Sequence, residues 1–253
     1  MATVRLTMSQ ALTRWMTAQS IEQLDGSIEP AFAGVWAIFG HGNVAGLGEA
    51  LYGVRDELPT YRGHNEQSMA HIAIAYAKQK QRRRMMAVTT SIGPGATNLA
   101  TAAALAHVNR LPVLLLPGDV FATRAPDPVL QQVESFADGT VSANDCLRPI
   151  SRYFDRITRP EQLLQALPKA MSVLTDPADC GPVTLGLCQD VQAEAWDYPE
   201  SFFAPRVWHM RRISSDAAEL SRAIEILKSA KRPMIVAGGG VRYSGASQTL
   251  TAF

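Results

Sequence analysis

Short apolar segments that end in glycine-containing loops alternate with helical segments along most of this chain. Val35–Phe39 is an apolar run that stops at Gly40, and Met85–Thr90 leads into a second glycine loop. Such alternation favours parallel strands joined by right-handed crossovers, with helices on both faces of an open sheet. We therefore predict an α/β fold with a ligand site at the carboxyl ends of its strands. The expected strands are 35–39, 58–62, 85–90, 112–117, 153–157 and 183–187, and the expected helices are 8–19, 44–52, 66–80, 95–108 and 161–174.

Composition excludes several classes of protein. The 253 residues carry 24 Lys and Arg against 23 Asp and Glu, for a net charge of +1, which gives no electrostatic footprint for nucleic acid or an anionic membrane. No apolar run approaches the roughly 20 residues that a membrane-spanning helix needs, and no secretory signal is recognisable, so we expect a cytoplasmic protein. The three cysteines lack C-x-x-C spacing, which argues against a disulfide framework and a zinc site.

The composition and the periodicity of the sequence change after residue 193. Residues 194–212 are rich in aromatic residues and proline without a helix or strand period, and we expect a linker packed on a surface. Ser214–Ser229 then predicts a helix with Ser214 as N-cap, followed by a strand at Pro233–Ala237 and a turn at Gly238–Gly240. Thr249–Phe253 shows no terminal helix. We expect one complete domain (1–193), a linker (194–212) and the beginning of a second α/β domain (213–253), and hence the N-terminal part of a longer polypeptide.

A carboxylate and a glycine loop form the most informative pair of motifs. Glu66 opens the predicted helix 66–80, and Gly93-Pro94-Gly95 follows the strand 85–90. A glutamate in the first turn often serves only the helix dipole, and a glycine loop often only turns the chain. Glycine also lets a ligand approach the backbone closely, so the two together favour a cofactor site. His64 and His71, seven apart, do not match the i, i+4 pattern of a metal site, and none is predicted here.

These motifs resemble those of the thiamine-diphosphate-dependent enzymes of the acetolactate synthase type. The family has a His-Glu-Gln segment followed by a Thr-Ser-Gly-Pro-Gly-Ala-Thr-Asn loop, which correspond here to the segments 61–71 and 90–99. In the family the glutamate hydrogen-bonds N1′ of the aminopyrimidine and activates the cofactor. The resemblance implies that Glu66 is the catalytic residue. The implied cofactor-binding residues are Glu66, Gly42, Asn43, Gly93, Pro94 and Gly95, and the implied substrate-mouth residues are His41 and Gln131.

A narrower resemblance is to the trihydroxycyclohexane-1,2-dione hydrolases of myo-inositol catabolism. It rests on the segments 5–7, 38–44, 58–67, 121–124 and 196–203. It implies hydrolytic C–C cleavage that opens a cyclic diketone to 5-deoxyglucuronate. Three departures from the acetolactate synthase pattern argue against acetolactate chemistry: Gly40–Asn43 replaces Gly-x-Pro-Gly, Ile92 is inserted before Gly93, and Gly186-Leu187-Cys188 replaces Asp-x-Pro. A related carboligase or decarboxylase, or a non-catalytic binding module, remains the alternative.

The family's anchor for diphosphate and Mg²⁺, a Gly-Asp-Gly sequence followed about thirty residues later by Asn, is absent from this chain. Asp138-Gly139 followed by Asn144 has the wrong spacing. The resemblance implies that these ligands come from a C-terminal domain of a partner subunit in a homo-oligomer. We expect the chain alone to be inactive.

Two further motifs have a plain structural interpretation. Arg82-Arg83-Arg84 follows a helix end, where a solvated cap is favoured over a binding patch. Gly238-Gly239-Gly240 lacks the full G-x-G-x-x-G pattern, so a simple turn is favoured over a dinucleotide loop.

Overall fold

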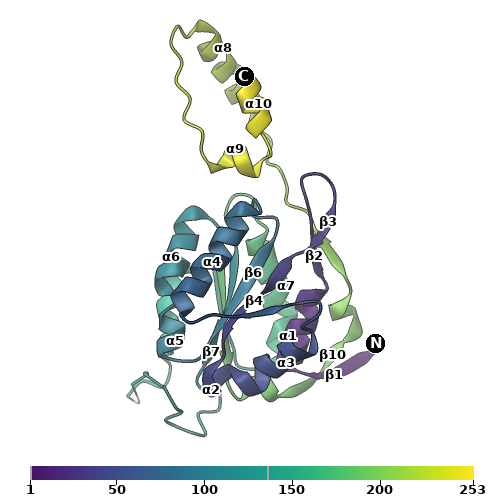
Figure 1. Ribbon diagram of the computed structural model, residues 1–253, viewed down its shortest axis with the longest axis vertical. Helices are drawn as coiled ribbons and strands as arrows, with labels where there is room; N and C mark the ends of the chain where they lie inside the picture. The colour runs from purple at the N-terminus through teal and green to yellow at the C-terminus, as the bar shows by residue number, and fades with distance from the viewer. Residues whose placement is uncertain (1, 136) are drawn as a thin grey trace.

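A computed structural model describes residues 2–135 and 137–253. Its centre is a parallel sheet of six strands in the order β5-β4-β6-β7-β9-β8. The predicted α/β class with an open parallel sheet is therefore confirmed (Figure 1). The strands are β4 (Phe32–Ile38), β5 (Thr60–Arg62), β6 (Met85–Thr90), β7 (Val113–Asp119), β8 (Tyr153–Ile157) and β9 (Pro182–Cys188).

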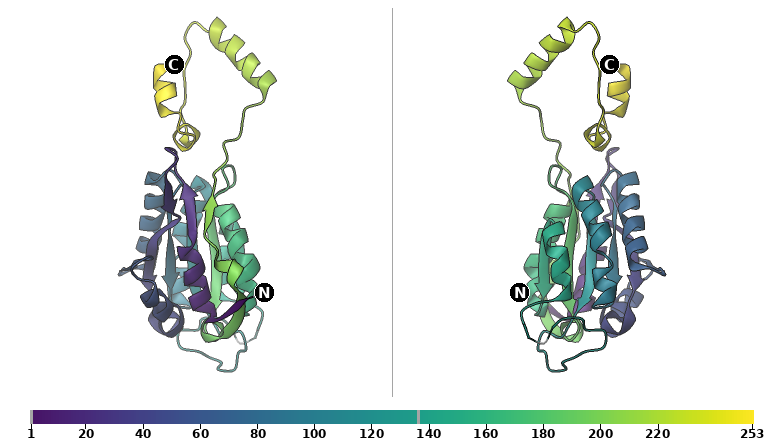
Figure 2. Two further views of the ribbon diagram at one scale, coloured as in Figure 1. Left: turned by 90° about the vertical axis from the view of Figure 1, so that its right-hand side faces the viewer. Right: turned by 90° about the vertical axis from the view of Figure 1, so that its left-hand side faces the viewer.

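Helices cover both faces of this sheet because its central strands are apolar on both sides. Met85 and Ala87 of β6 face one hydrophobic cluster, whereas Met86 and Val88 face the other. Figure 2 shows the resulting layers edge-on. The helices α4 (Glu66–Gln79) and α6 (Ala100–Asn109) contribute to one cluster, and α1 (Met8–Thr17) and α7 (Leu163–Leu174) contribute to the other.

The connections at the carboxyl edge of the sheet are short helical turns. After β4 the chain forms α2 (Gly40–Asn43), a π-helical turn (Val44–Gly48) and α3 (Glu49–Gly53), so the predicted helix begins earlier than expected. After β6 it forms α5 (Pro94–Thr97) and then α6, which divides the predicted helix 95–108. Short 3-10 helices span Ala143–Ile150, Pro160–Gln162, Val191–Ala193 and Glu200–Phe203.

The expectation that residues 194–212 contain no strands was wrong. β10 (Ala195–Pro199) pairs antiparallel with β1 (Thr3–Thr7), and β11 (Arg206–Trp208) pairs parallel with β2 (Gln19–Glu22), which also pairs with β3 (Ile28–Pro30). These short strands obtain their hydrogen bonds from distant partners, and a local period does not reveal such pairing. The segment still packs on the core, since Tyr198 is fully buried.

The C-terminal elements differ from expectation in three places. α8 (Ala217–Ser229) is capped by Asp216 rather than Ser214, because the Asp216 carboxylate accepts from Ala218 N at 2.9 Å. Pro233–Ala237 forms no strand, and no neighbouring strand offers it hydrogen bonds. The predicted glycine turn instead begins α9 (Gly239–Tyr243), and a further helix, α10 (Ser247–Ala252), follows. Among the described residues, no helix is both long and apolar enough to cross a membrane.

Candidate active site

Glu66 lies at the carboxyl edge of the sheet, where β5 leads into α4. Asn65 caps this helix by accepting from Ser68 N at 2.9 Å, which fixes the first turn and with it Glu66. One carboxylate oxygen of Glu66, Oε2, accepts a hydrogen bond from Asn98 Nδ2 at 2.9 Å. Oε1 has no hydrogen-bond partner among the described residues. The half-buried carboxylate is therefore held by one oxygen and free to bind with the other.

Gly95 keeps the space beside that free oxygen open. A Cβ at Gly95 would lie 3.2 Å from Glu66 Oε1 and 3.6 Å from Ser91 Cβ. A side chain there would crowd the carboxylate, so the glycine allows a flat ring to approach both the loop backbone and Oε1. Pro94 occupies the first turn of α5, where its missing N–H costs no helical hydrogen bond.

Gly93 is required by the conformation of the loop. Its φ of +59° lies in the left-handed region, which residues with a Cβ rarely adopt. A Cβ there would also lie only 2.1 Å from the backbone oxygen of Gln131. The loop that carries Gln131 therefore lies directly over Gly93.

Ser91 joins these loops, and sequence reasoning missed it. Its hydroxyl donates to Gln131 Oε1 at 3.3 Å. A Cβ at Gly40 would lie 2.4 Å from Ser91 Oγ, so the loop after β4 packs against the same side chain. The signal was its position directly after β6, at the edge where parallel strands place their ligand-binding residues.

Gly42 and Asn43 lie beneath the candidate site rather than in its open space. Both are buried. Asn43 Nδ2 donates to Thr89 Oγ1 at 2.7 Å and to the Thr90 carbonyl at 2.8 Å, and Asn43 Oδ1 accepts from Gln192 Nε2. These bonds fasten the loop after β4 to β6. Contact of Gly42 and Asn43 with a cofactor stays a prediction, and the geometry gives them a positioning role.

His41 lies at a cavity of about 720 Å³ beside this loop. Its Nε2 is buried without a hydrogen-bond partner among the described residues, and its carbonyl accepts from Gln189 Nε2 at 3.4 Å. A buried unpartnered imidazole nitrogen is costly unless a ligand group meets it. His64 lines the same cavity from the β5–α4 connection, so the structure brings a second histidine to the mouth that we predicted for His41. The lining residues are Ala37, Ile38, Phe39, Gly40, His41, Val44, Arg62, Gly63 and His64.

Asp190 fastens the start of the loop that carries Gln131. Its carboxylate accepts from Ala122 N at 2.8 Å, from Thr123 N at 3.1 Å and from Thr123 Oγ1 at 2.9 Å. Burial raises the pKa of Asp190, but the hydrogen bonds from Thr123, Ala122 and Val191 together lower it below its ordinary value. The charged carboxylate therefore stabilises this end of the loop.

A buried ion pair supports the neighbouring strands. Asp119, at the end of β7, is 2% exposed and accepts from Arg156 Nε at 2.8 Å and from Ser142 Oγ at 2.9 Å. Burial lowers the pKa of Arg156, yet the charges of Asp119, Cys188 and Asp145 and the hydrogen bond to Asp119 together raise that pKa above its ordinary value. Burial raises the pKa of the nearby Cys188 thiol to about 12, so this cysteine is an inert part of the core.

Comparison with known proteins gives the class. Residues 33–138 match the family described as "Thiamine pyrophosphate enzyme, N-terminal TPP binding domain". Residues 220–253 match "Thiamine pyrophosphate enzyme, central domain". The chain therefore belongs to the thiamine pyrophosphate enzymes, and it carries their N-terminal TPP binding domain, which includes Glu66 and both glycine loops. Thiamine pyrophosphate and thiamine diphosphate are the same compound.

The relatives narrow this class. Over all 253 residues the chain is 53% identical to a 3D-(3,5/4)-trihydroxycyclohexane-1,2-dione hydrolase of Geobacillus thermodenitrificans. It is equally similar, at 53% over 253 residues, to proteins of that name from Bacillus cereus and Bacillus anthracis. The match covers the whole chain but only 39% of the length of each relative.

The residues present fit one half of the cofactor. The free Oε1 of Glu66 beside the open space at Gly95 suits a flat heterocycle with a ring nitrogen. Within residues 2–135 and 137–253, no group of three or more His, Cys, Asp or Glu side chains is placed to hold a metal ion. The fit therefore concerns the pyrimidine ring, and no residue here is assigned to the diphosphate or its cation.

Proposed function

We propose that this chain supplies the pyrimidine-binding half of a thiamine-diphosphate-dependent C–C hydrolase. One observation carries the proposal: Glu66 is held through Oε2 by Asn98, while Oε1 lies free beside Gly95. The first hydrogen bond orients the carboxylate, and the second oxygen remains available to a ring nitrogen. We assign Glu66 the catalytic role and Gly93, Pro94 and Gly95 the cofactor-binding role, and we propose that Gly42 and Asn43 contribute to cofactor binding by positioning the loop after β4.

When bound, thiamine diphosphate supplies a carbon nucleophile and an electron sink for cleaving a bond beside a carbonyl. Glu66 Oε1 would hold a proton shared with a ring nitrogen of the bound cofactor, and Asn98 holds the carboxylate in place through Oε2. Gly95 leaves space beside Glu66 Oε1 into which a flat ring would fit, and Pro94 fixes the first turn of α5 next to it. Gln131, which accepts a hydrogen bond from Ser91, lies over the glycine loop at the mouth of the site.

We propose trihydroxycyclohexane-1,2-dione as the substrate, opened to 5-deoxyglucuronate in myo-inositol catabolism. The names of the similar proteins support this choice. The cavity at the mouth suits a polyhydroxylated ring, because His41, His64 and Arg62 offer it polar groups. The buried Nε2 of His41 is the group that most needs a partner, and a substrate hydroxyl would satisfy it.

The remaining parts of the assembly belong to the same proposal. We assign residues 1–193 to the pyrimidine-binding domain, 194–212 to a linker and 213–253 to the beginning of a central domain. Diphosphate and Mg²⁺ would be held by the C-terminal domain of a partner subunit in a cytoplasmic homo-oligomer. Nucleic acid and membrane have no part in it.

Product analysis tests the proposal directly. The enzyme that contains this chain together with a diphosphate-binding domain is incubated with the cyclic dione or with pyruvate, in the presence of thiamine diphosphate and Mg²⁺. We expect the ring-opened acid from the dione and no acetolactate from pyruvate. Acetolactate as the main product would favour the carboligase alternative, and no turnover of either substrate would favour a non-catalytic module.

A further inference from the structure

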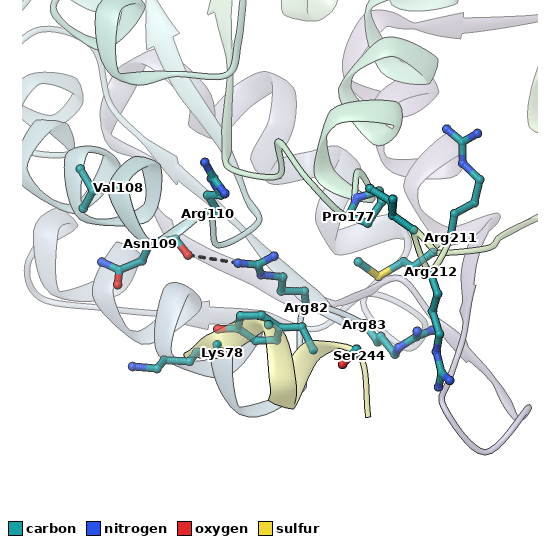
Figure 3. A pocket seen from close by; sticks show the side chains of 15 residues that line it. Lys78, Arg82, Arg83, Val108, Asn109, Arg110, Pro177, Arg211, Arg212 and Ser244 are labelled. Carbon is teal, nitrogen blue, oxygen red and sulfur yellow. Dashed lines mark hydrogen bonds between the residues drawn. The ribbon is translucent and has the colours of Figure 1, made fainter. Parts of the chain in front are cut away.

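The opposite end of the molecule contains a second cavity, of about 620 Å³. It lies at the amino ends of the central strands, between the sheet domain and the C-terminal elements (Figure 3). Its walls come from the C-terminal ends of α4 and α6, from residues 210–213 and from α9. The candidate active site lies at the carboxyl edge, so the two sites share no residue.

All charged side chains that line this cavity are basic. Its lining contains no Asp or Glu, but it contains six basic residues: Lys78, Arg82, Arg83, Arg110, Arg211 and Arg212. In the described part of the chain, none of the six forms an ion pair. The next residue, Arg84, lies outside the cavity and pairs with Glu29 at 3.2 Å. Arg84 thus has a carboxylate partner, whereas the described residues form no ion pair with the arginines of the cavity.

Two of these arginines are buried, against our expectation of a solvated cap. Arg82 is 8% exposed and Arg83 is 7% exposed, and Nε of each lacks a partner among the described residues. Burial, and to a lesser extent the charge of Arg212, lowers the pKa of Arg83 against a weaker attraction by Glu22, whose carbonyl accepts from Arg83 Nη1 at 2.7 Å. Buried cations without an ion-pair partner are costly, so this arrangement favours an external anion more than a solvated cap would.

The backbone and the neighbouring groups fix this arrangement. Gln81 and Arg82 both have positive φ, of 54° and 66°, which is uncommon for residues other than glycine. The Arg82 guanidinium lies 3.8 Å from the centre of the Tyr243 ring and donates to the Asn109 carbonyl at 3.3 Å. Figure 3 shows Arg82 between the end of α6 and the segment with Arg211 and Arg212. The guanidinium is thus oriented before any ligand binds.

We propose that this cavity binds a small anion with two or more phosphate groups. Guanidinium groups match phosphate oxygens in geometry and charge. Six cations around this volume exceed what a single phosphate could contact. The overall charge of +1 argues against a general polyanion surface, because the excess is confined to one cavity.

Calorimetry with inorganic pyrophosphate tests the proposal on residues 1–253, at low ionic strength and with a chelator to remove divalent cations. We expect saturable binding that weakens with added salt, and weaker binding of inorganic phosphate. The exposed rim allows variants that keep the fold: Arg110→Gln and Arg212→Gln should each weaken pyrophosphate binding about fivefold or more. Arg55→Gln is the matched control, because Arg55 is exposed, follows α3 and does not line the cavity. This variant should leave the affinity for pyrophosphate unchanged.

Two results would overturn the proposal. One is the absence of saturable pyrophosphate binding, and the other is equal weakening by Arg55→Gln and by the two rim variants. Glu66→Gln should leave pyrophosphate binding unchanged. This keeps the anion site distinguishable from the proposed thiamine chemistry, since either can fail without the other.

Discussion

The two ends of the parallel sheet differ in whether their charged side chains have partners within the chain. At the carboxyl end, Glu66, Asp119 and Asp190 each accept hydrogen bonds from donors within the chain. At the amino end, Arg82 and Arg83 are buried without a carboxylate partner in the described residues. In the two proposals above, a site for chemistry and a site for binding have different requirements. The first requires charges held in defined positions, and the second leaves its counter-charge to the ligand.

Loss of the Glu66 carboxylate should give the largest effect at the carboxyl end. Glu66→Gln keeps an acceptor for Asn98 but cannot share a proton in the same way. We expect turnover by the complete enzyme to fall about 10²–10⁴-fold, with the melting temperature of residues 1–253 unchanged. Steady-state kinetics and thermal unfolding provide the two measurements. Activity within about threefold of wild type would remove Glu66 from the mechanism.

Gly93→Ala tests how firmly the loops of the carboxyl end are packed. The added Cβ meets the Gln131 backbone oxygen at 2.1 Å and adopts a left-handed φ. We expect a loss of about 2–3 kcal/mol in the free energy of unfolding, measured by urea denaturation. Gly26→Ala is the matched control, because Gly26 has a φ of +85° but nothing within 4 Å of its added Cβ. If both variants lost the same stability, the close approach of the two loops would be unsupported.

Asp190→Asn should give a smaller, pH-dependent effect. The folded-state pKa of Asp190 lies below its ordinary value, so its stabilisation is fully present above the unfolded-state pKa and is lost as the pH falls through the folded-state pKa. We expect a loss of about 1 kcal/mol at pH 7, allowing for solvent screening of this partly exposed group. The difference from wild type should shrink below about pH 4. Urea denaturation at several pH values measures the free energy of unfolding of both proteins. A difference between them that stays the same at acid pH would contradict the stabilising role of the Asp190 carboxylate.

The smallest effect is expected at the amino end. Arg212→Gln removes a charge that acts on the buried Arg83 guanidinium. We expect a slight gain in stability at low salt without ligand, within the few tenths of a kcal/mol typical of exposed charges. The gain should vanish in 1 M salt, where screening acts over about 3 Å. A loss of stability in Arg212→Gln at low salt would show that Arg212 and Arg83 do not repel each other.

The sequence predicted the central sheet well because its strands carry their own signal. β6 and β8 have the predicted bounds, and α4 begins at Glu66 as expected. Runs such as Leu114–Leu116 are buried on both faces, so the apolar run itself marks the strand. The strands of the small sheet, β1 and β10, were missed because they depend on each other across most of the chain. Pro233–Ala237 has the composition of a strand but lacks a partner.

The residues of the candidate site that belong to a sequence motif could be predicted. The contacts between side chains of different loops could not. Glu66 and Gly95 do lie together, as the resemblance implied. Asn98 and Ser91 were overlooked as partners, because their roles depend on which loops the sheet brings to one edge. Burial of Arg82 and Arg83 was also hidden, since helix-end cations are ordinarily solvated.

The pairing of β1 with β10 also imposes an order in time. Thr7 lies opposite Ala195, so β1 leaves the ribosome well before the strand with which it pairs. At ordinary rates of translation, the roughly 190 residues between them take about 10–40 s to synthesise. Throughout that interval the edge of β1 lacks its partner and is open to pairing with other nascent chains. β1 therefore waits longer for its partner during synthesis than any strand of the central sheet does.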